Sequence, residues 1–381
     1  MNRRIRKGFS LFLFYIYNRI ISQFVPIKDK AVFLSEATAH LDGNLKKMSE
    51  FIADKGIHIE FYMKSDRRKR MSLKELCNIM YAMTTSKYIF LDDFYGLVSA
   101  MKVRKNQNLV QLWHGAGAFK KFGFSRLNTG DNVKKVHRGY KKYTHVSVTS
   151  ESVQWCYAEA FGIDADNIKA YGVPRLDYFF NVETIDKEKN KFFNQFPEMI
   201  GKKIVLVVPT YRGKKIEDAA YAFDKLNAEK ICSCLGDDYK VIVRWHPALQ
   251  NNIKLGKVKY NLPDGVTDLS DYDSINRLLL VTDVLITDYS SVIFDYFFVK
   301  KPIIYFPYDL DAYDASRGLY YPFEDYVYGD IAYDTEGIID SIRKSSLHEN
   351  RRNQFYNMFL NGCDGKSTEK IFNWVFENER L

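Results

Sequence analysis

Short runs of apolar residues alternate along the chain with longer segments in which apolar residues recur every three or four positions. The short runs predict buried strands, and the longer segments predict helices that cover them. This alternation is typical of a parallel sheet with helices on both faces. Strands are expected at residues 31–34, 58–62, 88–91, 109–113, 145–148, 203–209, 239–245, 284–287 and 302–306.

The pattern is interrupted at 181–201, a charged helical stretch without a strand signal. We interpret it as a connector, because 381 residues are enough for two domains with a full core each. The predicted fold class is α/β, with two doubly wound Rossmann-like domains, a cleft between them, and ligands at the carboxyl ends of the strands. The expected divisions are an N-terminal amphipathic segment at 1–28, the two domains at 29–180 and 202–345, and C-terminal helices at 346–381. The whole stretch from residue 335 to residue 381 is predicted to be helical.

Composition excludes some classes of protein, and charge suggests partners. Hydrophobic residues make up 46% of the chain, as in folded soluble domains, and the five cysteines indicate neither a zinc ribbon nor a disulfide framework. Residues 1–150 hold 28 lysines and arginines against 11 acidic residues, whereas the rest of the chain holds 28 against 36. A basic half favours contact with nucleic acid, an anionic membrane or a polyanionic substrate.

The first residues favour a membrane surface among these partners. Arg3, Arg4, Arg6 and Lys7 precede the apolar and aromatic stretch 9–25, whose uninterrupted run is too short to span ~30 Å of hydrocarbon. We therefore predict a helix in the lipid interface, on the cytoplasmic face of the membrane, supported by basic clusters at 67–70, 102–105 and 134–142. A removed signal peptide and a core helix with a basic tail are the alternatives.

Two histidines follow predicted strands. His114 comes directly after the strand 109–113 and precedes a run of small residues, 115–118, whose backbone N–H groups can approach an anion while the imidazole accepts a proton. Arg244 and His246 lie at the end of the strand 239–245, and because strand side chains alternate, they are expected on one face. Such a pair would form a phosphate clamp, and the alternative is an edge arginine paired with a core histidine.

A third candidate group stands between the strand 284–287 and a helix predicted at 292–299. Ser290 and Ser291 place two hydroxyls and unpaired N–H groups at the start of that helix, which is an arrangement suited to a phosphate. Asp295 lies one turn further along, within reach of a ribose diol. Capping of the helix by Ser290 is the alternative, although it does not explain why Asp288 and Asp295 flank the two serines.

Several motifs in serial order resemble one known family, the CDP-glycerol glycerophosphotransferases of teichoic acid synthesis, from about residue 31 to residue 328. These motifs are Trp113-His114-Gly115, Gly172-Val173-Pro174-Arg175, Pro209-Thr210-Tyr211-Arg212, Arg244-Trp245-His246-Pro247, Thr287-Asp288-Tyr289-Ser290-Ser291 with Asp295, and Tyr308-Asp309 followed by Arg317-Gly318. The resemblance implies a fold of the GT-B type. It also implies that CDP-glycerol is surrounded by His114, Gly115, Ala116, Gly117, Ala118, Arg175, Thr210, Tyr211, Arg244, Trp245, His246, Ser290, Ser291 and Asp295.

The resemblance further implies the reaction and its partners. Glycerol phosphate would pass from CDP-glycerol to an undecaprenyl-pyrophosphate-linked acceptor, with release of CMP, and His114 would be the general base. His246, the second catalytic residue, would act with Arg244 on the charge that develops on the pyrophosphate. The two serines would hold the CMP phosphate, and Asp295 would hold the ribose. No cofactor is assigned, and Mg²⁺ stays open, because Asp288 could hold a divalent ion although the sequence shows no carboxylate cluster of the kind that a dedicated site requires.

One departure bears on the product. Polymerising members of the family commonly carry Thr-Pro where this chain has Ala116-Gly117, and no large accessory domain precedes the catalytic motifs here. The sequence therefore resembles the primase branch, which adds the first unit to a lipid-linked disaccharide. The alternatives are CDP-ribitol as donor, a GT-B glycosyltransferase that uses a nucleotide sugar, and an inactive or nucleic-acid-binding protein. The sequence contains no motif that resembles a nucleic-acid recognition element, which argues against nucleic-acid binding.

Overall fold

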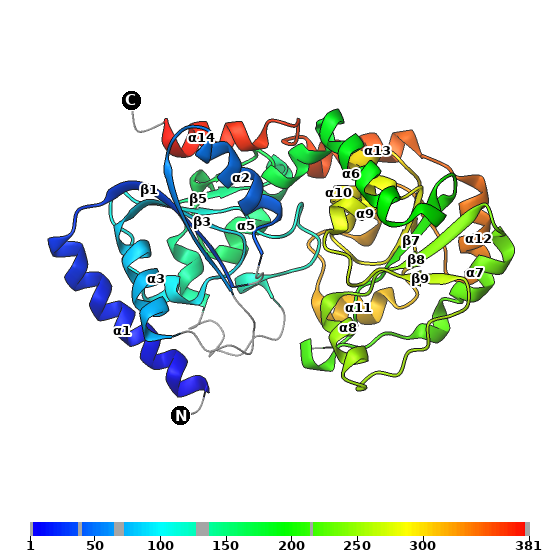
Figure 1. Cartoon of the computed structure of the whole chain (residues 1–381), viewed down its shortest axis with the longest axis horizontal. Coiled ribbons are helices and arrows are strands. Elements are labelled where there is room, and N and C mark those ends of the chain that lie inside the picture. Colours follow the sequence, from blue (N-terminus) through cyan, green and yellow to red (C-terminus); the bar gives the residue numbers. More distant parts are fainter. Residues whose placement is uncertain (1–2, 37–39, 65–71, 127–136, 214–215, 378–381) are drawn as a thin grey trace. The chain divides into compact units, whose positions relative to one another are not determined.

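The computed structural model describes residues 3–36, 40–64, 72–126, 137–213 and 216–377. These residues form two compact units (Figure 1). The first unit comprises Met1–Phe180 together with Phe359–Leu381, and the second comprises Asn181–Met358. The predicted basic cluster 67–70, residues 134–136 of the cluster 134–142, and the side chains of the first seven residues lie outside the described part of the chain.

The first unit is built on a six-stranded sheet in the order β2-β1-β3-β4-β5-β6, in which every neighbouring pair is parallel. Buried apolar and aromatic residues fill its central strands, as continuous apolar runs predict for a sheet covered on both faces. The strands are β1 (Lys28–Ser35), β2 (His58–Met63), β3 (Ser86–Leu91), β4 (Asn108–Gln111), β5 (His145–Ser147) and β6 (Ile168–Lys169).

Helices cover this sheet, and the last of them comes from the end of the chain. The helices of this unit are α1 (Arg3–Phe24), α2 (Gly43–Ala53), α3 (Leu73–Thr85), α5 (Gln154–Phe161) and α14 (Ser367–Phe376). Apolar residues of α2 and α14 form one core with the sheet, and the two helices lie side by side (Figure 1). Asp177 fixes the start of α14, because its carboxylate accepts from the Ser367 and Thr368 N–H groups at 3.0 and 2.8 Å.

Helix α1 packs against α3 and leaves an apolar stripe exposed. Phe14 and Asn18 are fully buried, and the Asn18 amide donates to Thr84 Oγ1 on α3 at 3.1 Å. The opposite face exposes large apolar side chains at helical spacing, namely Phe9 (52%), Phe12 (60%), Ile16 (40%), Ile20 (50%) and Phe24 (76%). Among the described residues, no helix combines the length and apolarity needed to cross a membrane.

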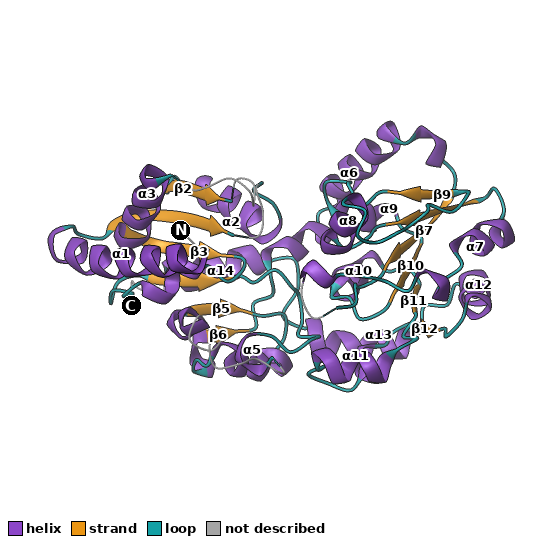
Figure 2. Ribbon diagram, turned by 90° about the horizontal axis from the view of Figure 1, so that it is seen from below, coloured by secondary structure: helices purple, strands orange, loops and turns teal. Residues whose placement is uncertain are grey.

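The second unit contains another parallel six-stranded sheet, in the order β12-β11-β10-β7-β8-β9 (Figure 2). Its strand order reverses between β7 and β10, and ligands bind at such a switch point in doubly wound sheets. The strands are β7 (Lys203–Val208), β8 (Tyr239–Val243), β9 (Val266–Asp268), β10 (Val284–Thr287), β11 (Ile303–Tyr305) and β12 (Asp330–Ile331). The helices are α6 (Val182–Gln195), α7 (Ala228–Leu235), α8 (Pro247–Lys254), α9 (Ile275–Val281), α10 (Val292–Tyr296), α11 (Leu310–Arg317), α12 (Thr335–Lys344) and α13 (Glu349–Phe355).

The structure differs from the expected divisions in two places. The stretch 181–201, interpreted as a connector, forms α6, which packs on α9 within the second unit and is joined to it by a 2.7 Å ion pair between Glu188 and Arg277. The C-terminal stretch is not helical throughout. Ser345 and His348 adopt positive φ angles of 51° and 46° between α12 and α13, and a right-handed helix cannot continue through such residues. From Phe359 the chain belongs to the first unit.

Candidate active site

In the first unit, the predicted histidine stands beside a carboxylate at the end of the neighbouring strand. His114 follows β4, and Asp93 follows β3, which pairs with β4. The His114 Nδ1 atom lies 3.5 Å from Asp93 Oδ1, and the imidazole is 57% exposed. Burial opposes the charge of Asp93, but the contact with His114 and the Phe94 N–H outweigh it, so the pKa of Asp93 lies below its ordinary value.

Asp92 directly precedes Asp93 in the sequence, and its pKa is shifted in the opposite direction. Burial raises the pKa of Asp92 to about 6, against a hydrogen bond from Ser35 that acts in the other direction. Asp93 also accepts a hydrogen bond from the Phe94 N–H at 2.7 Å. The surroundings therefore shift the pKa values of the two neighbouring aspartates in opposite directions. Neither residue was predicted from the sequence.

Buried hydrogen bonds fix the backbone that carries His114. Trp113 adopts a positive φ of 54°, which ends the strand two residues earlier than predicted. Asn44, at the start of α2, donates to the carbonyl oxygens of Leu112 at 3.3 Å and Trp113 at 2.6 Å, and it accepts from the Arg175 N–H at 2.9 Å. The Arg175 guanidinium donates to the carbonyl oxygen of His114. Arg175, predicted to bind substrate, therefore also braces this loop.

The small residues after His114 are likewise held by the protein. The Gly117 N–H donates to Thr149 Oγ1 at 3.1 Å, and the Tyr157 hydroxyl donates to the Gly117 carbonyl oxygen at 2.8 Å. Ala116 and Ala118 are buried. The Gly117 N–H, expected to face an anion, thus has a protein acceptor, whereas Gly115 is half-buried beside His114.

In the second unit, a buried ionic network lies at the switch point between β7 and β10. Asp288, which is 1% exposed, accepts through Oδ1 from the Thr210 N–H and hydroxyl and from the Tyr289 N–H, at 2.7 to 2.9 Å. Its Oδ2 atom lies 3.0 Å from the Arg212 guanidinium. Arg212 also makes a bidentate pair with Asp309, at 2.6 and 2.7 Å. Burial lowers the pKa of Arg212, but the two carboxylates outweigh it and leave that pKa above its ordinary value.

This network gives Asp288 and Arg212 structural roles. From the sequence, Asp288 was considered for a divalent cation, and Arg212 belongs to one of the motifs that carry the family resemblance. In the structure, each of the three nitrogen atoms of the Arg212 side chain donates to a protein acceptor, and these acceptors include the Thr210 carbonyl oxygen at 2.8 Å. Within the described ranges, no group of three or more His, Cys, Asp or Glu residues is placed to hold a metal ion.

The predicted clamp of Arg244 and His246 has a different geometry from the expected one. Strand β8 ends at Val243, so the alternation of strand side chains does not extend to these residues. His246 caps α8, because its Nδ1 atom accepts from the Ala248 N–H at 3.1 Å. The Arg244 guanidinium donates to the carbonyl oxygens of Leu269 and Tyr272 at 3.3 and 2.6 Å. His246 is nevertheless exposed, and it contacts Tyr211.

The side chains of His246 and Arg317, from separate elements, lie next to Tyr211. Its ring centroid lies 4.7 Å from the ring of His246, and the Arg317 guanidinium lies 5.3 Å from the same centroid. Arg317, at the end of α11, is fixed by a 2.6 Å hydrogen bond to the Gly213 carbonyl oxygen. Tyr211 and Arg317 are half-buried and His246 is exposed, so the group presents an imidazole, an aromatic face and a cation, which together suit a phosphorylated ligand.

The serines follow β10 as predicted, although the helix after them is short. Ser290 Oγ accepts from the Val292 N–H at 3.4 Å, which is the capping alternative, and both serines remain half-buried. Helix α10 spans only Val292–Tyr296. Asp295 points from it into a buried position with 4% exposure, so a ribose would reach this carboxylate only if the surrounding side chains moved.

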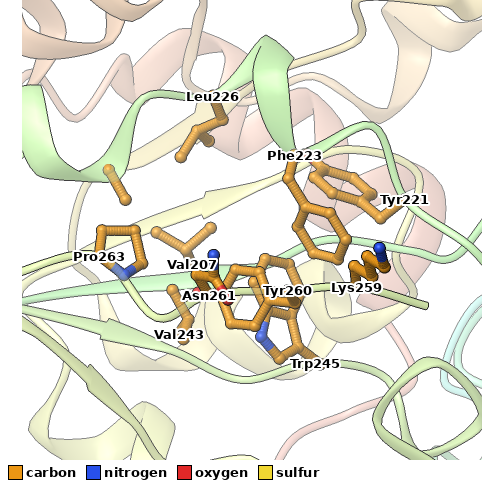
Figure 3. A pocket seen from close by; sticks show the side chains of 11 residues that line it. Val207, Tyr221, Phe223, Leu226, Val243, Trp245, Lys259, Tyr260, Asn261 and Pro263 are labelled. Carbon is orange, nitrogen blue, oxygen red and sulfur yellow. The ribbon is translucent and has the colours of Figure 1, made fainter. Parts of the chain in front are cut away.

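Trp245 lines a cavity of about 200 Å³ in the second unit (Figure 3). The indole is 5% exposed, and its ring lies 5.0 Å from Tyr260 and 5.2 Å from Phe223. Lys259 and Asn261 supply polar groups to the lining, and Val207 and Val243 form part of its wall. Trp245 therefore points into an aromatic-walled space, whereas Arg244 binds backbone and His246 is exposed.

Two doubly wound parallel sheets, each with polar groups after its strands, define an α/β protein of the GT-B type, as predicted. A solved structure of the wall teichoic acid polymerase TagF has this fold, with a TM-score of 0.78 at 21% identity over 99% of this chain and 95% of that one. The chain belongs to the CDP-Glycerol:Poly(glycerophosphate) glycerophosphotransferase family, whose model matches residues 16–377. The resemblance drawn from the motifs is thereby confirmed.

Two relatives bear on the kind of teichoic acid enzyme. The poly(ribitol-phosphate) polymerase of Bacillus spizizenii is 37% identical over 98% of this chain, which spans about 60% of the length of that relative. The ribitol-phosphate primase of the same organism is 31% identical over 98% of this chain and 96% of its own length. Both similarities include the regions of His114 and Ser290, because they cover nearly the whole chain.

Proposed function

We propose that this protein transfers an alditol phosphate from a CDP-alditol to a teichoic acid acceptor and releases CMP. The observation that carries the proposal is the family match over residues 16–377, which includes every candidate residue from His114 to Asp295. Ribitol phosphate is the unit favoured by the two relatives, and glycerol phosphate, the original prediction, is the second candidate because of the family description.

The proposed chemistry is attack of an acceptor hydroxyl on the β-phosphorus of the donor. The oxygen–phosphorus bond to the acceptor forms, the bond to the CMP phosphate breaks with its electron pair on CMP, and the hydroxyl proton passes to His114. Phosphoryl transfer depends mainly on positioning and on neutralising charge. His246, Arg317 and the serines would supply positive or donor groups to the diphosphate. That His114 and His246 act on the same diphosphate stays a prediction.

A donor assay tests this function. We expect purified protein with a synthetic polyprenyl-pyrophosphate disaccharide, with and without a glycerol phosphate primer, to release CMP from CDP-ribitol at least tenfold faster than from CDP-glycerol. The reverse preference would select the second candidate. Release of UDP from a UDP-sugar, without any release of CMP, would replace the proposal by a glycosyltransferase. The length of the lipid-linked product then separates a primase from a polymerase.

We also propose that α1 binds the cytoplasmic surface of the membrane, where an undecaprenyl-linked acceptor would lie. Its exposed stripe of Phe9, Phe12, Ile16, Ile20 and Phe24 supports this proposal, because exposed apolar side chains gain free energy by entering the lipid interface. The Phe12→Glu variant is expected to co-sediment at least fivefold less with vesicles of phosphatidylglycerol and phosphatidylcholine. Trp155→Glu, at a 46% exposed aromatic on α5, is the matched control and should bind as the wild type does. Equal binding by Phe12→Glu would contradict the proposal.

A further inference from the structure

Asp93 contacts the proposed base and was identified neither by the motifs nor by charge patterning. We infer that Asp93 is a positioning residue, which holds the His114 imidazole with its proton on Nδ1 and so reserves Nε2 for the acceptor hydroxyl. The inference rests on the proposed function for its catalytic meaning. The geometry that carries it is the 3.5 Å separation between Asp93 Oδ1 and His114 Nδ1.

Hydrogen bonds from neighbouring residues hold both members of the pair. The Phe94 N–H donates to Asp93 Oδ1 at 2.7 Å, which fixes the carboxylate at the end of β3. On the other side, Asn44 binds the carbonyl oxygen of Trp113, and Arg175 binds that of His114. The Trp113 ring lies against the imidazole, with 4.5 Å between the ring centroids. The separation is therefore set by fixed loops at the ends of two paired strands.

The chemistry of the two groups then decides the tautomer. An ionised carboxylate only accepts hydrogen bonds, and a neutral imidazole has one donor and one acceptor nitrogen. Contact with Asp93 therefore favours a proton on His114 Nδ1 and a lone pair on Nε2. When Nε2 takes the proton of the attacking hydroxyl, the negative charge of Asp93 stabilises the imidazolium that results.

The neighbouring charges make Asp92 a matched control. Among the described residues, Asp93, Asp92 and Arg175 are charged groups near His114, and the Arg175 guanidinium binds the His114 carbonyl oxygen. Asp92 adjoins Asp93 in the sequence, but its hydrogen bond is to Ser35. A change at Asp92 thus alters local charge without removing the contact to Nδ1.

The tautomer is measured directly by ¹⁵N NMR on histidine-labelled protein at alkaline pH, where imidazoles are neutral. We expect the Nδ1–H form for His114 in the wild type and in Asp92→Asn. In Asp93→Ser the Nε2–H form should dominate, because a serine hydroxyl can still accept from the Phe94 N–H but does not reach the imidazole. The inference fails if the wild type shows Nε2–H, if Asp93→Ser retains Nδ1–H, or if Asp92→Asn changes as much as Asp93→Ser.

A kinetic measurement separates positioning from a merely structural role. We expect Asp93→Ser to lower kcat by roughly 10- to 100-fold with little change in the KM for the donor. An unchanged kcat would overturn the inference. The NMR result requires no substrate, so it decides the inference even if the chain does not act on CDP-alditols.

Discussion

Replacement of His114 by alanine is expected to lower kcat for alditol phosphate transfer by about 10²- to 10⁴-fold, the usual contribution of a general base. The affinity for the CDP-alditol should change less than about twofold, because the donor is expected to be held mainly by residues of the second unit. Initial rates of CMP release, together with calorimetric titration of the donor, measure the two effects separately.

The matched control for this variant is His58→Ala. His58 is also an exposed histidine of the first unit with a carboxylate nearby, since its Nε2 atom lies 3.7 Å from Glu60, but it stands at the start of β2. It should retain the wild-type rate. A His114→Ala protein that transfers as fast as the wild type would remove His114 from the reaction and, with it, the catalytic meaning of its contact with Asp93.

Replacement of Asp288 by alanine is expected to destabilise the second unit by about 3–5 kcal/mol, which is the usual cost of removing one partner of a buried ion pair. Asp288 is 1% exposed, and its loss would leave the Thr210 and Tyr289 N–H groups without their acceptor and Arg212 with one carboxylate fewer. Thermal unfolding followed by circular dichroism, with hydrogen exchange at β7 and β10, measures the effect.

The control for Asp288→Ala is an ion pair in the same unit that is open to solvent. Asp271 binds Lys254 at 2.6 Å with its side chain 74% exposed, and Asp271→Ala should cost less than about 1 kcal/mol because water screens such pairs. If the two variants unfold at the same temperature, the network at the switch point contributes no more than a surface pair. In that case, the conclusion that Asp288 holds Thr210 and Arg212 in place would be wrong.

The fold was predicted from local patterns wherever a strand is buried on both faces. The run 284–287 is continuous and apolar, and it forms β10 with the bounds expected. The very short strands β6, β9 and β12 were missed, because two or three residues carry no periodicity to detect. Strand ends were misjudged at Trp113 and Trp245, where aromatic residues continue the apolar run after the backbone has left the sheet.

The candidate site was predicted less completely than the fold. His114, Tyr211 and His246 were found because they follow strands within short motifs, and these positions hold in the structure. Asp93 and Asn44 were not found, since their contacts join segments 21 and 69 residues apart and no local pattern encodes such pairing. The partners of Arg212 were missed for the same reason, because Asp309 lies 97 residues further along the chain.

The return of the chain to the first unit at Phe359 has a practical consequence for protein engineering. The second unit is a continuous insert, 181–358, whereas the first is made from two pieces that flank it. A cut before residue 359 would therefore remove α14 and its contacts with Asp177 and α2, and would damage the piece that carries His114. Separate production of that piece requires Phe180 and Phe359 to be spliced by a designed loop.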